Sequence, residues 1–289
     1  MDVHTLLLQS LNGVQYGMLL FLVASGLTLI FGIMGVINLA HGSFYMVGAY
    51  LAFWLSSLTG SLWLALPAGL LITVGLGLLI ERTLIARLYR RNHLYQVLLT
   101  YGLILILEEG RGILFGNDVH SVAVPDLLGG SIQLTATLNY PVYRLFIAAL
   151  CLVVAGGLYL LIQRTRLGMI IRAGASNPDM VQSLGIDIRR VHMGVFALGV
   201  ALAGLAGMIA APAASVFPGM GNHILIISFV VVVVGGIGSV KGALFAALLL
   251  GLADTFGQVL MPDLAGTTVY LLMALVLLWR PEGLFRKVA

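Results

Sequence analysis

Long apolar runs separated by short polar segments dominate the pattern of this chain. A helix needs ~20 mostly apolar residues to cross a bilayer, so each run of about that length is a candidate membrane span. The candidate spans are residues 11–32, 36–55, 62–80, 94–115, 142–162, 191–212, 224–240, 243–260 and 267–279. The glycine-rich join around Gly32, Gly35 and Gly42 leaves open whether the first two runs are separate spans or one span followed by a re-entrant element. We therefore expect an all-α integral membrane protein with eight or nine transmembrane helices and glycine-broken or re-entrant segments.

The composition supports a membrane protein. Of the 289 residues, 60% are apolar and only 9% are charged, whereas a soluble domain averages about 25% charged residues. The Lys and Arg residues occur as short clusters between apolar runs and not as a continuous patch, which indicates membrane orientation and no nucleic-acid partner. No Pro-rich or Ser-rich linker divides the chain, so we expect one transmembrane domain over residues 1–289.

The positions of Lys and Arg predict the orientation of the chain. Three clusters, at residues 82–91, 164–190 and 280–287, can lie on the cytoplasmic side together with Lys241, which leaves only Arg111 and Arg144 near the outer face. The loop 116–140 carries two Asp and no Lys or Arg, as suits an outer loop. The C-terminus is then cytoplasmic, and the side of the N-terminus depends on whether eight or nine crossings exist. The start of the chain lacks the positive charge of a cleavable signal peptide, so the first span is expected to be retained.

Residues 163–190 form the longest polar segment with a helix signal of its own. Asn177 can accept hydrogen bonds from free backbone N–H groups, Pro178 suits the first helical position, and Asp179 lies near the positive end of the helix dipole. Gly185 supplies a left-handed stop, so the helix covers about two turns, residues 178–184. One side of it carries Met180, Val181 and Leu184, and the other carries Asp179, Gln182 and Ser183. So short a helix needs support, and the bilayer surface, the rest of the chain and another protein each remain possible.

Two glycine-interrupted stretches, residues 31–50 and 231–251, point to a translocation route. Offset by 203 positions, they align Gly32 with Gly235, Gly35 with Gly238 and Gly48 with Gly251. Transporters place broken helices at corresponding positions of two halves, where the unwound backbone lines the pathway. The candidate pathway residues are Asn38, His41, Gly235, Gly236, Gly238 and Asp254.

Polar groups inside apolar runs allow two interpretations each. Asn38 and His41 either satisfy backbone groups freed by the glycine break or line the route. Asp254 has no local partner in the sequence, and it either faces a wet pathway or bonds a neighbouring helix. Glu108 and Arg111 are three positions apart and can pair on one helix face, or these residues and Glu109 simply reach interfacial water.

Several catalytic and cofactor-binding patterns are missing from the sequence. The segment 236–242 is glycine-rich, but the Gly-Lys-Ser/Thr order of a phosphate-binding loop does not follow. The six histidines show no i, i+4 pairing and the single cysteine, Cys151, lies in an apolar run, so we expect no metal site. No catalytic residues are predicted, and an enzyme or scaffold is disfavoured. A sparse set of buried Asp, Glu and His also disfavours an ion-coupled secondary transporter, which stays an alternative.

Four segments together resemble the LivH-type permease subunits of branched-chain amino acid ABC importers. They are GLTLIFGIMGVINLAHGSFYMVGAYLA at 26–52, RTRLGMIIRAGASNPDMVQSLGID at 164–187, VVVVGGIGSVKGALFAALLLG at 231–251 and WRPEGLF at 279–285. The resemblance covers almost the whole chain. It implies a multi-pass subunit of the bacterial cytoplasmic (inner) membrane that imports branched-chain or other hydrophobic amino acids.

The resemblance also implies partners. They are a second related permease, two ATP-binding cassette subunits that hold ATP and Mg²⁺, an extracytoplasmic substrate-binding protein and the membrane lipid. No cofactor is expected in this chain. By position, the ATPase-coupling residues are Arg172, Asn177, Pro178, Asp179, Met180, Gln182, Leu184 and Gly185. The adjacent acids Glu108 and Glu109 depart from the family pattern, so urea, amides or other small solutes remain alternative substrates.

Overall fold

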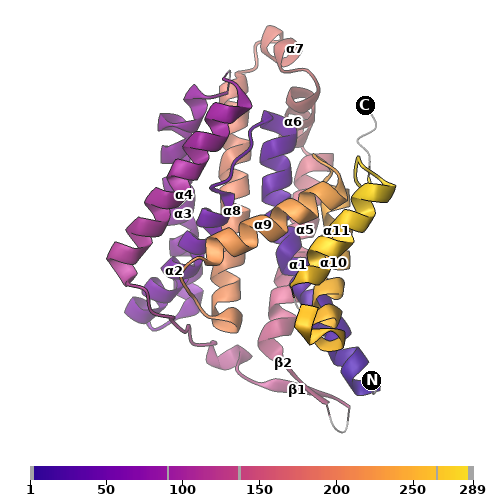
Figure 1. The fold of residues 1–289 in the computed structure, drawn as a ribbon. Helices are drawn as coiled ribbons and strands as arrows, with labels where there is room; N and C mark the ends of the chain where they lie inside the picture. Colours follow the sequence, from indigo (N-terminus) through magenta and orange to yellow (C-terminus); the bar gives the residue numbers. More distant parts are fainter. Residues whose placement is uncertain (1–2, 90, 136–137, 265, 286–289) are drawn as a thin grey trace.

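Helices account for nearly all of the secondary structure of this chain (Figure 1). The computed structural model describes residues 3–89, 91–135, 138–264 and 266–285. Within these residues the α-helices are α1 (Val3–Met34), α2 (His41–Thr59), α3 (Leu62–Thr83), α4 (His93–Phe115), α5 (Val142–Arg164), α6 (Arg166–Ser176), α7 (Pro178–Ser183), α8 (Ile188–Ala214), α9 (Met220–Gly235), α10 (Val240–Leu260) and α11 (Thr267–Trp279). Three short 3-10 helices are η1 (Ile85–Arg87), η2 (Asp126–Leu128) and η3 (Pro262–Leu264).

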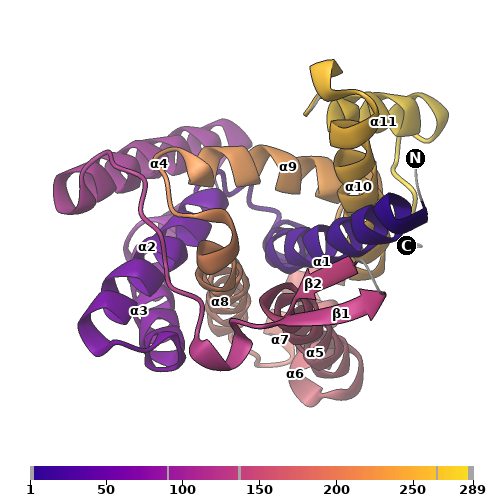
Figure 2. The ribbon, with the colours of Figure 1, turned by 90° about the horizontal axis from the view of Figure 1, so that it is seen from below.

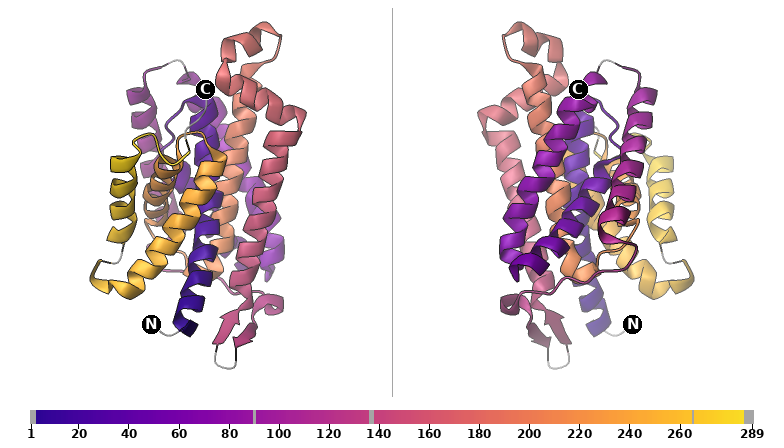
Figure 3. Two further views of the ribbon diagram at one scale, coloured as in Figure 1. Left: turned by 90° about the vertical axis from the view of Figure 1, so that its right-hand side faces the viewer. Right: turned by 90° about the vertical axis from the view of Figure 1, so that its left-hand side faces the viewer.

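The bundle has two distinct ends. At one end, called the hairpin end below, strands β1 (Ser131–Thr135) and β2 (Leu138–Pro141) form an antiparallel pair in which Ile132 lies opposite Tyr140. At the other end, called the α7 end, α6 and α7 project beyond the long helices (Figures 1 and 3). The N-terminal end of α1 lies at the hairpin end (Figure 3).

Long apolar helices confirm a multi-pass membrane protein. Among the described residues, five helical segments are long and apolar enough to cross a bilayer: His4–Met34, Leu62–Arg87, Val142–Arg164, Ile188–Ala214 and Val240–Leu260. Helices α9 and α11 are apolar but have only 16 and 13 residues. The expected total of eight or nine crossings therefore stays a prediction.

The spans differ in how far the protein itself surrounds them. The most apolar part of α1 is 83% buried, whereas the corresponding part of α5 is only 22% buried. Figure 2 shows α1 and α8 inside the bundle, with α3, α4, α5 and α11 around them. The rings of Phe44 on α2 and Phe196 on α8 meet edge to face, with centroids 6.0 Å apart. The core thus centres on α1, α2 and α8, and the outer helices are the ones that the rest of the chain covers least.

Both glycine-rich joins interrupt helices. The join that left the first two runs ambiguous separates α1 from α2, and Gly35, with a φ of 63°, follows the last residue of α1. The second join differs from the expected boundary between 224–240 and 243–260, because α9 already ends at Gly235 and α10 begins at Val240. Gly236 and Gly238 adopt φ values of 95° and 79°, which a helix cannot accommodate. Hydropathy placed this boundary too late because the residues at the join are apolar, whereas the glycine pattern of 231–251 predicted the interruption.

Close glycine contacts join α1 to α8 and α2 to α9. A Cβ atom on Gly26 of α1 would lie 2.7 Å from the carbonyl oxygen of Gly199 on α8, and one on Gly199 would lie 3.1 Å from the oxygen of Gly26. A Cβ on Gly221 of α9 would lie 2.9 Å from the oxygen of Gly42 on α2. Because α1 begins at the hairpin end and α8 at the α7 end, these two packed helices run in opposite directions (Figure 1). The 203-position offset sets the α1–α2 break beside the α9–α10 break, and it stays a prediction.

The segment after α11 packs on the α9–α10 join. Backbone N–H groups of Leu284 and Phe285 donate to the carbonyl oxygens of Val234 and Gly235, at 2.8 and 3.3 Å. The Phe285 ring stacks on Phe245 of α10, with centroids 5.1 Å apart. The WRPEGLF segment and the glycine-rich join thus form one structural unit at the α7 end.

Candidate functional site

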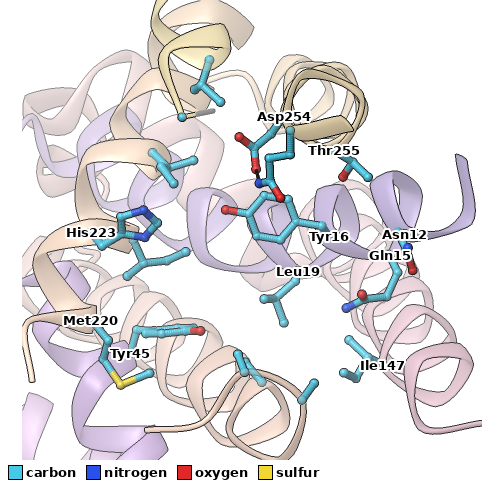
Figure 4. A pocket seen from close by; sticks show the side chains of 18 of the residues that line it. Asn12, Gln15, Tyr16, Leu19, Tyr45, Ile147, Met220, His223, Asp254 and Thr255 are labelled. Carbon is cyan, nitrogen blue, oxygen red and sulfur yellow. Dashed lines mark hydrogen bonds between the residues drawn. The ribbon is translucent and has the colours of Figure 1, made fainter. Parts of the chain in front are cut away.

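A polar cavity of about 770 Å³ opens at the hairpin end between α1, α2, α5, α8, α9, α10 and α11 (Figure 4). Its polar lining comes from several helices: Gln9, Asn12, Gln15, Tyr16, Tyr45, Arg144, His223, Asp254, Thr255 and Gln258. Apolar side chains, among them Leu19, Ile147 and Ile224, complete the wall. Polar groups that line a cavity within a membrane bundle are the ordinary mark of a solute pathway.

Asp254 is the buried acid of this cavity, with 8% of its surface exposed. Its Oδ2 atom accepts a hydrogen bond of 2.8 Å from the Gln258 side chain, one turn further along α10. The expectation that Asp254 has no local partner is therefore wrong, because residues four apart lie on one helix face. Figure 4 shows Tyr16 of α1 and His223 of α9 facing the same space. The structure places Asp254 on the wall of this polar cavity, and its role in a pathway stays a prediction.

Arg144 supplies the positive charge of the same cavity. It comes from the first turn of α5, and its Nη1 atom donates to Oδ1 of Asn12 on α1 at 2.6 Å. The cavity therefore combines an acid from α10 and a base from α5 with amides and hydroxyls. The distribution of Lys and Arg predicts Arg144 near the outer face but indicates no role for it.

The side chains of Asn38 and His41 contact backbone groups inside the bundle. Both are fully buried. The Asn38 side chain accepts a 3.1 Å hydrogen bond from the backbone N–H of Ala40, and His41 Nε2 lies 3.0 Å from the carbonyl oxygen of Val23. Neither lines the 770 Å³ cavity. Of the two interpretations open from the sequence, the structure favours satisfaction of a backbone group at the α1–α2 break for Asn38, whereas His41 contacts a carbonyl oxygen within α1.

The three candidate pathway glycines belong to the α9–α10 join. Gly235 packs on Gly242, where a Cβ atom would meet the Gly242 backbone at 2.6 Å. Gly236 lies against Phe285, and Gly238 lies against Gly32. None of them lines the 770 Å³ cavity, although Gly238 borders a smaller one of about 330 Å³ at the α7 end. Their geometry shows close helix packing.

The charged cluster on α4 connects this helix to the start of α9 through hydrogen bonds. Arg111 pairs with Glu108 at 2.9 Å, as their spacing predicts. Arg111 also donates to the carbonyl oxygen of Gly116 at 2.5 Å, and Glu108 accepts from the backbone N–H of Gly219 at 3.0 Å. The pair thus joins the end of α4 to the start of α9, whereas Glu109 is exposed.

The expected two-turn helix exists as α7. The Asn177 side chain accepts a 2.9 Å hydrogen bond from the N–H of Met180, and Pro178 is the first helical residue. The helix ends at Ser183, one residue before the expected end, and Gly185 adopts a φ of 80°. Figures 1 and 3 show α7 as the outermost part of its end of the bundle.

The side chains of this region differ from the expected amphipathic pattern. Val181 is 3% exposed, but Met180 and Leu184 are 60% and 70% exposed. Asp179 and Gln182 are exposed too. Two apolar side chains therefore lie uncovered on α7, so the expected apolar side does not pack as a unit.

The preceding helix, α6, was missed by the sequence analysis. Arg172 lies on it, and its Nη1 atom donates to the carbonyl oxygen of Ile162 at the end of α5. The Thr165 hydroxyl caps α6 by accepting a 3.1 Å hydrogen bond from Gly168. A threonine cap before an apolar run is a recognisable helix signal, and it could have predicted this helix.

A multi-pass helical bundle with a polar cavity at one end and a projecting capped helix at the other is typical of a membrane transport protein. The family model described as branched-chain amino acid transport system / permease component matches residues 9–278. The chain belongs to this family of permease components.

Curated relatives match nearly the whole chain. The permease protein BraD of a high-affinity branched-chain amino acid transport system of Pseudomonas aeruginosa is 33% identical over 99% of this chain and 97% of its own length. The corresponding permease protein LivH of Escherichia coli K12 is 30% identical over 96% of this chain and 95% of its own. The permease protein LivM of the same organism is 30% identical over 92% of this chain and 68% of its own.

Proposed function

We propose that this chain is the transmembrane permease subunit of an ATP-driven importer for branched-chain or other hydrophobic amino acids. The observation that carries the proposal is the family match over residues 9–278, together with 33% identity to BraD over almost the whole of both chains. The role of a transport subunit, and not of an enzyme, follows from that family.

The cavity supports the substrate class. An amino acid has an ammonium group, a carboxylate group and, in this class, an apolar side chain. Asp254, Arg144 and the apolar wall at Leu19 and Ile224 offer one complement to each of these parts. Solute entering from the hairpin end would meet these groups before it reached the glycine-packed centre of the bundle.

The α7 region supports energy transfer from partner subunits. A capped, projecting helix with exposed Met180 and Leu184 is suited to docking in a groove of an ATPase subunit. ATP binding and hydrolysis there would move α7, and the spans around the cavity would rock between outward-facing and inward-facing states. Asn177, Pro178 and Gly185 shape the helix, and Asp179, Met180, Gln182 and Leu184 contact the ATPase. Arg172 supports it from α6.

The proposed assembly has further members. A second related permease completes the membrane unit, and similarity of this chain to both LivH and LivM supports such a pairing. Two ATP-binding cassette subunits hold ATP and Mg²⁺, and an extracytoplasmic binding protein delivers the substrate. In this arrangement the chain lies in the bacterial cytoplasmic membrane with the α7 end and the C-terminus in the cytoplasm, in keeping with its positive charges.

Reconstituted uptake tests the function. The chain is incorporated into proteoliposomes with the second permease and the two ATPase subunits encoded beside it, and the neighbouring binding protein is added outside. We expect leucine uptake that requires ATP inside the vesicles and stops without the binding protein. A matched assembly with a hydrolysis-deficient ATPase is the control.

The alternatives give different outcomes. Uptake by this chain alone, driven by a proton or sodium gradient, would show an ion-coupled secondary transporter. ATP-dependent uptake of urea or an amide with no response to leucine, valine or isoleucine would keep the importer mechanism and replace the substrate.

A further inference from the structure

A second cavity, of about 330 Å³, lies at the α7 end between α1, α5, α6 and the start of α10. It is separate from the polar cavity at the hairpin end, and no residue lines both. The α9–α10 join forms one of its edges through Gly238 and Ser239.

The charged groups of this cavity are both cations. Arg172 comes from α6 and Lys241 from the first turn of α10, and among the described residues that line the cavity none is Asp or Glu. The bond of Arg172 to the carbonyl oxygen of Ile162 fixes its guanidinium group at the edge. Lys241 makes no ion pair with any described residue. The positive end of the α10 dipole adds to the same field, so the cavity favours an anion.

Thr28 is an independent sign of a polar ligand. Its side chain lines the cavity and is 1% exposed, yet its Oγ1 atom has no hydrogen-bond partner among the described residues. A buried hydroxyl without a partner is costly, and native proteins satisfy nearly all of them. A ligand oxygen in the cavity would supply the missing partner.

The remaining wall is mostly apolar, with Gln163 and Ser239 as its other polar side chains. Leu29, Ile33 and Ile162 line it. Tyr159 of α5 also lines it and is 48% exposed, on the span that the protein covers least. A ligand with a hydrocarbon chain can therefore enter from the bilayer between α5 and its neighbours, with its charged group toward Arg172 and Lys241.

We propose that this cavity binds one anionic phospholipid. Its phosphate lies between Arg172 and Lys241, one of its oxygens accepts from the Thr28 hydroxyl, and an acyl chain follows Ile162 and Tyr159. Basic pockets between transmembrane helices at the cytoplasmic side are a known mode of lipid headgroup recognition. The bound lipid joins α6, which leads directly into α7, to the start of α10.

Native mass spectrometry of the purified full-length chain tests the proposal. The chain is delipidated in detergent and then titrated with phosphatidylglycerol or with phosphatidylcholine of the same acyl chains. A third arm uses inorganic phosphate alone. We expect phosphatidylglycerol to bind at least tenfold more tightly than phosphatidylcholine, with no saturable binding of millimolar phosphate.

Matched variants assign the binding to this cavity. The double variant Arg172→Gln/Lys241→Gln is expected to lose the preference for phosphatidylglycerol. Arg164→Gln, which removes an exposed arginine of α5 outside the cavity, is expected to keep it. Thr28→Val preserves the side-chain shape and is expected to weaken phosphatidylglycerol binding severalfold without lowering the unfolding temperature of the lipid-free chain.

Three results would overturn the proposal. One is equal affinity of the wild-type chain for both lipids, and another is an unchanged preference in both the double variant and Thr28→Val. The third is tight binding of inorganic phosphate that blocks phosphatidylglycerol, which would assign the cavity to a soluble phosphate compound. Because the purified chain is tested without partner subunits, none of these results bears on the proposed transport function.

Discussion

The carboxylate of Glu108 accepts a hydrogen bond from the backbone N–H of Gly219, at 3.0 Å across 111 positions of sequence. The same carboxylate pairs with Arg111, whose guanidinium group is largely buried. One acidic side chain thus fixes the end of α4, the loop after it and the start of α9.

We expect Glu108→Ala to lower the stability of the folded chain. It leaves the buried Arg111 charge and the Gly219 N–H without their partner, and loss of one member of a buried pair costs about 3 kcal/mol. Thermal unfolding in detergent, followed by a thiol-reactive dye at the single, buried Cys151, measures the change. Glu109→Ala is the matched control because that side chain is exposed, and equal effects of the two substitutions would contradict the structural role.

Gly26→Ala is expected to separate α1 from α8. The added methyl group would lie 2.7 Å from the carbonyl oxygen of Gly199, and overpacking of this kind costs roughly 1–3 kcal/mol. Gly75→Ala on α3 is the control, since nothing lies within 4 Å of its Cβ position. The same dye assay should show a lower unfolding temperature for the first variant only, and an unchanged Gly26→Ala would contradict the close approach.

Met180→Lys is expected to weaken the association with the ATPase subunits at least fivefold, because the exposed Met180 side chain lies on the proposed docking helix. Co-purification with a tagged ATPase subunit measures this. Leu127→Lys, at an even more exposed position near the hairpin, should leave it intact. If the Met180 variant assembles and takes up substrate as the wild type does, the proposal that α7 docks on the ATPase is contradicted.

Accessibility of the polar cavity can be measured with introduced cysteines in a Cys151→Ala background. Thr255→Cys is expected to react with a membrane-impermeant thiol reagent added outside cells, because Thr255 lines the cavity at the proposed outer side. Ser228→Cys should react at least tenfold more slowly, since Ser228 is fully buried. Reaction of the Thr255 variant only from the cytoplasmic side would reverse the proposed orientation.

Local features of the fold could be predicted from the sequence. The caps of α7 at Asn177, Pro178 and Gly185 depend only on neighbouring residues, and so does the i, i+3 pair of Glu108 and Arg111. The apolar runs likewise predicted a multi-pass membrane protein, because bilayer thickness sets a minimum length.

Features that depend on distant packing could not be predicted. Asn38 and His41 lie beside a helix break, and sequence alone does not tell whether their polar atoms meet a backbone or a cavity. Glu108 reaches Gly219 only in the folded bundle, and Arg144 and Asp254 meet one cavity from different helices. Apolar residues give the same hydropathy whether they face lipid, another helix or a solute, so the periodicity of the spans does not identify the pathway.

The pairing of Leu284 and Phe285 with Val234 and Gly235 has a consequence for biosynthesis. The α9–α10 join leaves the ribosome well before the segment that completes its backbone hydrogen bonds, since α10 and α11 must be synthesised and inserted in between. Final assembly of the α7 end therefore follows membrane insertion of the last helices. A chain released early would contain all the proposed docking residues of α7, but the α9–α10 join at the same end would lack its hydrogen bonds to Leu284 and Phe285.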